Sequence, residues 1–198
     1  MNSKILAWNI RRDVLDMVHA AHASHIGSAF SVADIIAVLY TDFVDKKQLL
    51  SGDKERSRII LSKGHAGAAI YAALAEIGLM DKKELQTYGT NGSKLSCHVS
   101  HGNVNGVEIS TGSLGQGVGM AAGIALAGKK AGLNYRTFVI AGDGECNEGS
   151  VWEEMLISAA LNAVGGQLIA LIVSLINIWL SLSIKTSPVI YNYKAGDV

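Results

Sequence analysis

The segment VIAGDGECNEGSVWE at residues 139–153 joins an apolar run to residues that could hold a metal ion. The run ends in Gly142, Asp143 and Gly144, and glycines let the chain turn tightly at the carboxyl end of a strand, where α/β sheets usually bind ligands. The Asp143 carboxylate offers the hard oxygen that Mg²⁺ prefers. A plain Asp-Gly turn explains the tripeptide when it is considered alone. Together with the other motifs of the chain, it predicts an Mg²⁺ ion that bridges Asp143 and a diphosphate.

Six histidines form a second group of residues suited to chemistry. Near neutral pH, a neutral imidazole can donate to a phosphate oxygen or relay a proton. His19, His22 and His25 are three residues apart, a helical spacing that also invites a metal-site interpretation. Ligands of other types are missing from this spacing, so we interpret His19 and His22 as residues on the flank of a helix.

The elements that must position these residues follow from the apolar periodicity. Residues 5–22 have the three-to-four spacing of an amphipathic helix, and a second helix is predicted over residues 32–43 with Ser31 as its N-cap. A short β-branched run at 57–61 then predicts a strand. The loop after this strand leads into an alanine-rich helix that we expect to end at Gly78.

The second half repeats the order of strand and helix. Residues 88–112 look like a loop, and helices are predicted over 114–132 and 150–163, on either side of a buried strand at 136–141. Three glycines at four-residue steps would permit close packing of the first of these helices: Gly115, Gly119 and Gly123. Alternating strands and helices favour a parallel sheet covered by helices.

Composition changes sharply near residue 160. Residues 163–198 contain only Lys185, Lys194 and Asp197 as charged residues. The run at 168–184 fits a buried strand with an apolar extension. A membrane segment is the alternative, but serines and an asparagine interrupt the run, and spanning needs about 20 apolar residues. We therefore divide the chain into a domain at 1–162 and a divergent apolar tail at 163–198.

The charge balance and the cysteine content limit the classes of function. Seventeen Lys and Arg against 17 Asp and Glu give a formal net charge of zero, which offers no broad attraction to nucleic acid or to an anionic membrane. Two cysteines, Cys97 and Cys146, suit a reducing compartment. The N-terminus lacks the pattern of a secretion signal. We expect a cytoplasmic protein without nucleic-acid or membrane partners.

Four motifs occur in an order that resembles the transketolase family, especially members made as separate N- and C-terminal subunits. They are SHIGSAFSVADIIAVLY at 24–40, IILSKGHAGAAIYAALAEIG at 59–78, GVEISTGSLGQGVGMAAGIALAGK at 106–129, and the aspartate loop at 142–150. The resemblance covers roughly residues 10–160. It implies a thiamine-diphosphate-binding α/β fold, a parallel sheet flanked by helices, with residues 1–162 as the diphosphate-binding domain and part of the fold missing.

The resemblance also implies roles for three histidines and several loop residues. His65 would lie beside the diphosphate, and His25 and His98 would contact the substrate; His101 is a weaker candidate. The loop backbone at Gly112 and Leu114 would lie against the aminopyrimidine ring. The remaining cofactor residues would be Asp143 and Gly144 at the diphosphate and Glu148 near the subunit interface. The family's second metal ligand, an asparagine, falls here on Val173, and Asn177 is the nearest candidate.

The activity implied by the resemblance is transfer of a two-carbon ketol unit between sugar phosphates, as in the pentose phosphate pathway. It would require thiamine diphosphate and Mg²⁺, with Ca²⁺ or Mn²⁺ as substitutes for Mg²⁺. The family activates the aminopyrimidine with a glutamate of another domain, which this chain does not encode. We therefore expect a complementary C-terminal subunit and a homo- or hetero-oligomer.

Two alternatives remain open at the level of sequence. One is another thiamine-diphosphate enzyme, similar to deoxyxylulose-phosphate synthase, although the wording of the SHIG and STGSLGQG motifs favours transketolase. The other is a non-catalytic remnant or an interaction subunit, for which the tail is the best support. We interpret the break in composition as the mark of an interrupted, shifted or truncated N-terminal subunit of a split transketolase.

Overall fold

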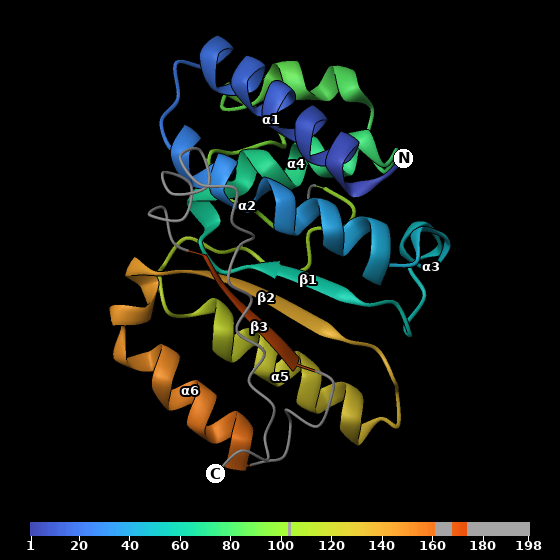
Figure 1. The fold of residues 1–198 in the computed structure, drawn as a ribbon, viewed down its shortest axis with the longest axis vertical. Coiled ribbons are helices and arrows are strands. Elements are labelled where there is room, and N and C mark those ends of the chain that lie inside the picture. Colours follow the sequence, from blue (N-terminus) through green and yellow to red (C-terminus); the bar gives the residue numbers. More distant parts are fainter. Residues whose placement is uncertain (103, 161–167, 174–198) are drawn as a thin grey trace.

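The computed structural model describes residues 1–102, 104–160 and 168–173 of the chain. Within these residues, three parallel strands form one sheet in the order β1 (Arg58–Leu61), β2 (Thr137–Gly142) and β3 (Leu168–Val173). Helices cover both faces of the sheet, with α1, α2 and α4 on one side and α5 and α6 on the other (Figure 1). The predicted parallel sheet flanked by helices is therefore confirmed.

The helical elements of the described residues lie before and between the strands along the chain. They are α1 (Ser3–Ala20), α2 (Ile26–Val38), the π-helical turn η1 (Leu39–Phe43), α3 (Lys46–Ser51), η2 (Gly64–Ala66), α4 (Gly67–Glu76), η3 (Lys82–Thr87), α5 (Gly117–Lys130), η4 (Gly144–Asn147) and α6 (Gly149–Ala160). The elements η2, η3 and η4 are 3₁₀ helices. Two of them, η2 and η4, closely follow the strands β1 and β2, so that each strand leads into a tight helical turn.

Alternate strand residues divide the apolar core into two layers. Phe138 and Ile140 of β2 pack with α1, α2 and α4, whereas Val139 and Ala141 face α5 and α6. Side chains of a strand point to opposite faces in turn, so residues 138–141 of β2 must all be apolar to serve both layers. All six residues of β2 are indeed buried. This requirement explains why a continuous apolar run identified the strand.

The helix α2 begins earlier than the sequence predicted. Ser31 is not an N-cap: α2 starts at Ile26, the N-cap position belongs to His25, and the Ser31 hydroxyl donates to the Ser28 carbonyl oxygen at 2.6 Å. Ile26 and Phe30 pack against the core, and this tertiary contact extends the helix toward its N-terminus. A serine inside a helix is tolerated when its hydroxyl bonds back to the preceding turn.

The glycines near α5 serve different purposes. A Cβ on Gly119 would lie 2.2 Å from Glu154 Oε1 of α6, and one on Gly115, just before α5, would lie 2.4 Å from Ser150 Oγ. The predicted close packing is therefore confirmed at these two positions. It is wrong for Gly123, where an added Cβ would meet nothing within 4 Å. Gly78, which has φ of +79°, ends α4 as predicted.

The segment Ile26–Phe43 is long and apolar enough to cross a membrane by length and composition alone. Its helix α2 contacts both α1 and α4 and contributes buried residues to the core, so core packing accounts for its apolar character.

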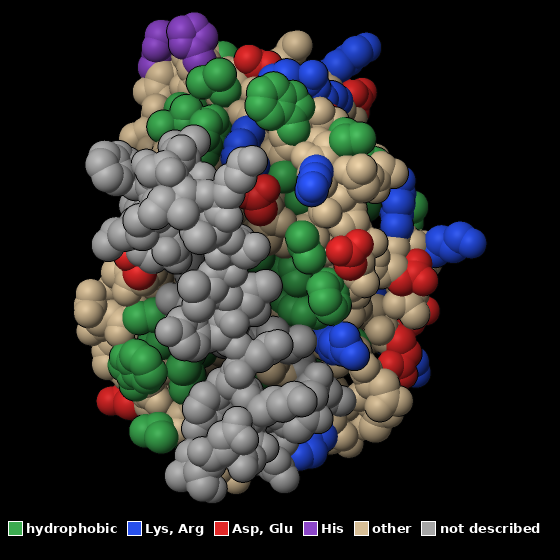
Figure 2. All heavy atoms as spheres, viewed as in Figure 1, with side chains coloured by type: hydrophobic (Ala, Val, Ile, Leu, Met, Phe, Trp, Pro, Cys, Tyr) green, Lys and Arg blue, Asp and Glu red, His purple; other side chains and the backbone are tan. Residues whose placement is uncertain are grey.

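In the tail, residues 168–173 pair with β2 as strand β3. On the face seen in Figure 2, basic and acidic side chains are intermixed, in keeping with the zero net charge.

Candidate functional site

The predicted site residues gather at the carboxyl ends of β1 and β2. These strands are parallel neighbours, with Leu61 paired to Ile140, so the segments that follow them emerge at the same edge of the sheet. The segment after β1 carries Lys63 and His65, and the segment after β2 carries Asp143. This edge is where open α/β sheets usually bind ligands.

His25, His65 and His98 form a cluster of rings, although they come from three separate segments. Ring centroids lie 5.2 Å apart for His25 and His65, 5.8 Å for His25 and His98, and 6.5 Å for His65 and His98. His25 and His98 are exposed, and His65 is half-buried. The structure thus brings together the three histidines that the resemblance selected, while their individual roles stay predictions.

The backbone at His25 has an uncommon conformation. His25 has φ of +72°, in the left-handed region that few non-glycine residues adopt. Such conformations cost free energy and often occur at functional sites. His22 also has a positive φ, of +49°, and its ring lies 6.5 Å from that of His19 near the end of α1. His101 Nδ1 lies 2.8 Å from the Val107 carbonyl oxygen.

The environment of His65 favours its neutral form. Burial lowers the pKa of His65 below its ordinary value, and the positive charge of Lys63 and the two neighbouring histidines lower it further. A neutral imidazole has one nitrogen that donates and one that accepts. His65 can therefore donate to an anionic ligand or accept a proton near neutral pH.

Lys63 is a functional candidate that the sequence reasoning missed. It is 3% exposed, and its Nζ donates to Ser31 Oγ at 3.0 Å. Burial lowers the pKa of Lys63, while the negative charges of Asp143 and Glu145 oppose this effect. A buried ammonium group beside a predicted diphosphate site can act as a point charge for phosphate oxygens. The motif SKGH contained the signal, but we considered only its histidine.

Hydrogen bonds join the loops that surround the histidines. Val99 N donates to the Gly64 carbonyl oxygen at 3.1 Å, and Thr111 N donates to the Val99 carbonyl oxygen at 3.1 Å. Thr111 Oγ1 also donates to the Leu61 carbonyl oxygen at 2.6 Å. The approach is so close that a Cβ on Gly64 would lie 2.2 Å from the Thr111 carbonyl oxygen. These contacts fix the segments around Gly64, Val99 and Thr111 relative to one another.

Gly112 and Leu114, which are predicted to lie against the aminopyrimidine ring of the cofactor, follow Thr111 in one of these loops. Gly112 has φ of +152°, and a Cβ there would lie 2.9 Å from His98 Cδ2. Glycine is therefore required both by the backbone conformation and by the histidine ring. Leu114 is 36% exposed, so its side chain is accessible to a ligand. Both positions suit a loop that a ligand approaches closely.

Glu145 also escaped the sequence reasoning. It is 2% exposed, and its Oε1 accepts hydrogen bonds from Ser62 Oγ and from Gly115 N, the latter at 2.9 Å. Its Oε2 accepts from Gly142 N at 3.0 Å. Because the sequence pattern GDGE is typical of an exposed turn, nothing local indicated that this carboxylate is buried.

The donor chemistry at Asp143 fits Mg²⁺. Asp143 and Gly144 are exposed at the end of β2, and Asp143 provides a carboxylate. Mg²⁺ usually keeps several waters and binds through one or two carboxylates together with phosphate oxygens, so one protein carboxylate suits such a site. The described residues contain no group of three or more His, Cys, Asp or Glu that could hold a metal ion alone. Asn177 lies outside the described residues.

Two further features lie apart from the histidine cluster. Glu148 is exposed at the start of α6, and its backbone N donates to the Glu145 carbonyl oxygen at 3.0 Å.

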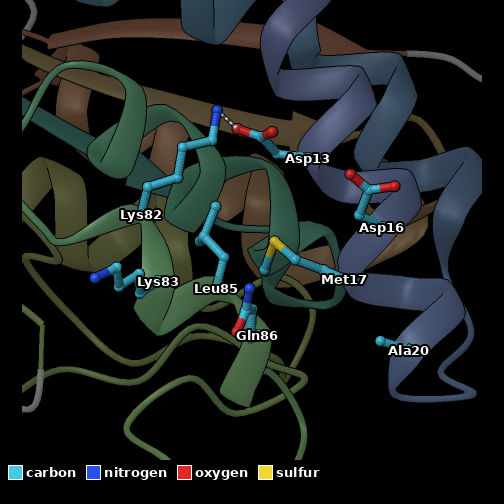
Figure 3. A pocket seen from close by; sticks show the side chains of 8 residues that line it. All are labelled: Asp13, Asp16, Met17, Ala20, Lys82, Lys83, Leu85 and Gln86. Atoms are coloured by element: carbon cyan, nitrogen blue, oxygen red, sulfur yellow. Dashed lines mark ion pairs between the residues drawn. The ribbon is translucent and has the colours of Figure 1, made fainter.

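A pocket of about 490 Å³ lies between α1 and η3, and Figure 3 shows Asp13 and Lys82 on its facing walls. Lys82 Nζ lies 3.0 Å from Asp13 Oδ2. None of the residues predicted to bind the cofactor or the substrate lines this pocket.

Comparison with known proteins decides the family. The sequence model described as "Transketolase, thiamine diphosphate binding domain" matches residues 2–178. The chain belongs to the transketolase family. The match extends beyond residue 162, so the division of this transketolase-family chain into 1–162 and 163–198 remains a prediction.

Curated relatives agree with this assignment. The transketolase-family chain is 37% identical over 149 residues to the 6-deoxy-6-sulfo-D-fructose transketolase subunit SqwG of Clostridium sp., covering 75% of the chain and 54% of the relative. It is 36% identical over 143 residues to an apulose-4-phosphate transketolase subunit from Phocaeicola vulgatus, covering 72% and 50%. The chain thus spans about half the length of these relatives.

Solved transketolases share the fold. The transketolase of Leishmania mexicana superposes with a TM-score of 0.76 at 28% identity, covering 87% of this chain and 27% of that chain. The transketolase of Campylobacter jejuni gives a TM-score of 0.74 at 30% identity, covering 87% and 28%. The transketolase-family chain therefore corresponds to about a quarter of each of these longer proteins.

Proposed function

We propose that this chain is the diphosphate-binding N-terminal part of a split transketolase, which transfers a two-carbon ketol unit between sugar phosphates. The observation that carries the proposal is the cluster of His25, His65 and His98 at the sheet edge that also holds Lys63 and Asp143. Together they provide imidazole donors, a buried ammonium group and a carboxylate at one edge. This combination suits a metal-bound diphosphate with a sugar beside it.

The residues at the ends of β1 and β2 would hold the diphosphate. Asp143 would bind Mg²⁺, for which Ca²⁺ or Mn²⁺ could substitute, and Lys63 and His65 would donate to phosphate oxygens. Because Lys63 is buried, its charge is poorly screened by water and attracts an anion more strongly than a surface lysine would. Gly112 leaves space for the cofactor ring to approach the loop backbone.

The two exposed histidines would act on the sugar. When bound, thiamine diphosphate supplies the carbanion chemistry of the reaction. His25 and His98 lie on the exposed side of the cluster, where they can donate to substrate hydroxyls and relay protons. Their positions are fixed by the start of α2 and by the loop contact between His98 and Gly112. Positioning and proton relay are the contributions of this chain.

A complementary C-terminal subunit would complete the enzyme as a hetero-oligomer. The support for this is the word "subunit" in the names of two curated relatives. The partner would supply the glutamate that activates the aminopyrimidine in the family. We place the assembled enzyme in the cytoplasm, with sugar phosphates as substrates.

Reconstitution tests this function directly. The chain would be combined with a C-terminal transketolase subunit from the same source and assayed with a ketose phosphate donor and an aldose phosphate acceptor. We expect ketol transfer that requires both chains, thiamine diphosphate and Mg²⁺, and that is lost in Asp143→Ala but kept in Asp16→Asn, an exposed site on α1. A correctly assembled complex without transfer would instead support a non-catalytic remnant.

A further inference from the structure

The buried carboxylate of Glu145 connects three separate segments of the site. Its hydrogen-bond donors are the Ser62 hydroxyl after β1, the Gly115 amide before α5 and the Gly142 amide at the end of β2. Burial of an ionised carboxylate costs free energy unless several donors replace the lost water. Both oxygens of Glu145 have such donors, so neither oxygen is buried without a hydrogen-bond partner.

Each of these three donors adjoins a residue of the proposed cofactor site. Ser62 precedes Lys63, Gly142 precedes Asp143, and Gly115 follows Leu114. The carboxylate therefore lies behind three residues that would contact the diphosphate, the metal and the cofactor ring. The Gly115 amide lies in the peptide plane that it shares with Leu114, and Ser62 and Gly142 are each covalently joined to a site residue, so a displacement of these segments would also displace the site residues.

The surrounding packing leaves little freedom for these segments to adjust separately. A Cβ on Gly117 would lie 2.3 Å from Ser62 Oγ, so the start of α5 is pressed against the segment after β1. Ser150 Oγ of α6 donates to the Gly115 carbonyl oxygen at 3.1 Å, so both the N–H and the C=O of Gly115 are hydrogen-bonded. The Glu145 carboxylate thus sits within a rigid junction and sets its spacing.

We propose that Glu145 is a positioning residue that fixes Lys63, Leu114 and Asp143 in the arrangement needed to bind thiamine diphosphate and Mg²⁺. This inference rests on the proposed function, because it assigns those three residues to the cofactor site. Glu145 itself does not touch the cofactor. It acts through the Ser62 hydroxyl and the two glycine amides.

The substitution Glu145→Gln tests the proposal with the least change of shape. The amide group of glutamine can replace only one acceptor oxygen, so its NH₂ group would face at least one of the three donors. We expect affinity for thiamine diphosphate at saturating Mg²⁺ to fall about tenfold or more. The control Glu84→Gln makes the same chemical change on η3, at a partly exposed site, and should bind like the parent chain.

A spectroscopic readout separates positioning from a general loss of stability. In the chain without cofactor, the amide proton resonances of Gly115 and Gly142 should move upfield in Glu145→Gln, because carboxylate acceptors shift bonded amide protons downfield. Their exchange with solvent should also quicken. In Ser62→Ala, which removes one neutral donor, affinity should fall by a smaller factor. This variant keeps the test valid if Glu145→Gln does not fold.

The outcomes distinguish this inference from the proposed function. If the parent chain with its partner subunit does not bind thiamine diphosphate, the proposed function fails, whereas the two glycine resonances still report on the Glu145 contacts. If the parent binds and Glu145→Gln binds within about twofold of it, the positioning role is overturned. Unchanged glycine resonances in Glu145→Gln, or unchanged affinity in Ser62→Ala where Glu145→Gln is unfolded, would overturn it equally.

Discussion

The rings of His25 and His65 face each other with centroids 5.2 Å apart and planes tilted by 53°, the shortest separation in the histidine cluster. His25 sits at the start of α2, and His65 sits in the turn after β1. Their contact joins the substrate side of the proposed site to its diphosphate side. The two positions are therefore expected to respond differently to substitution.

Replacement of His25 should affect the sugar more than the cofactor. In the reconstituted enzyme, His25→Ala should lower kcat/KM for the ketose donor by about 10²-fold, since proton transfer by a positioned side chain contributes on this order. Affinity for thiamine diphosphate should stay within about threefold of the parent, because His25 lies outside the proposed diphosphate contacts. Parallel kinetic and calorimetric measurements would check the split, and an equal loss in both quantities would contradict it.

Replacement of Lys63 should weaken cofactor binding without unfolding the chain. Lys63→Met keeps most of the length of the buried stem and removes its charge, and exchanging a buried charge for an apolar group is often tolerated. We expect affinity for thiamine diphosphate to fall by about 10-fold to 100-fold, which corresponds to one lost charge-assisted hydrogen bond. Calorimetry at saturating Mg²⁺ would measure the loss. An unchanged affinity would remove Lys63 from the site.

The stability of the fold should fall at acid pH through His65. Because burial lowers the pKa of His65 in the folded state, the unfolded chain binds the proton more readily. The stability that depends on neutral His65 is complete above the unfolded pKa of about 6.5 and declines as the pH falls below it. Urea unfolding between about pH 7 and pH 5 should show a shallower decline in His65→Gln. In the control His19→Gln, which replaces an exposed histidine, the free energy of unfolding should decline with falling pH as steeply as in the parent chain.

Two glycines offer a matched test of loop packing. Gly64→Ala would place a Cβ 2.2 Å from the Thr111 carbonyl oxygen, and this backbone group cannot move without separating two loops of the site. We expect the free energy of unfolding to fall by about 1–3 kcal/mol or more. Gly123→Ala lies in α5 with open space around its Cβ and should be neutral or stabilising by about 1 kcal/mol. Equal effects of the two substitutions in thermal unfolding would contradict this packing.

Much of the fold could be predicted because its signals are local. The apolar run at β2 and the helix that ends at Gly78 follow from periodicity and from the conformational freedom of glycine. The start of α2 could not be predicted in this way. Ser31 has the residue type of an N-cap, but the packing of Ile26 and Phe30 against the core overrides that local preference.

Some residues of the candidate site could be predicted from the sequence, and others could not. The resemblance selected His25, His65 and His98, and the structure brings their rings together. Lys63 and Glu145 were missed because charged residues in short polar motifs are usually exposed. Their burial depends on donors and charges from other segments, such as Ser31 for Lys63 and Gly115 for Glu145. Only the assembled fold reveals such partners.

The most direct test of the central claim is a calorimetric titration of the folded chain, with its partner subunit present, with thiamine diphosphate. Titrations would be made with Mg²⁺, with a chelator, and with Asp143→Ala beside the control Asp16→Asn. The account predicts saturable, Mg²⁺-dependent binding that is kept in the control and lost in Asp143→Ala. Absence of binding by the folded parent assembly, or binding that is indifferent to both Mg²⁺ and Asp143, would contradict it.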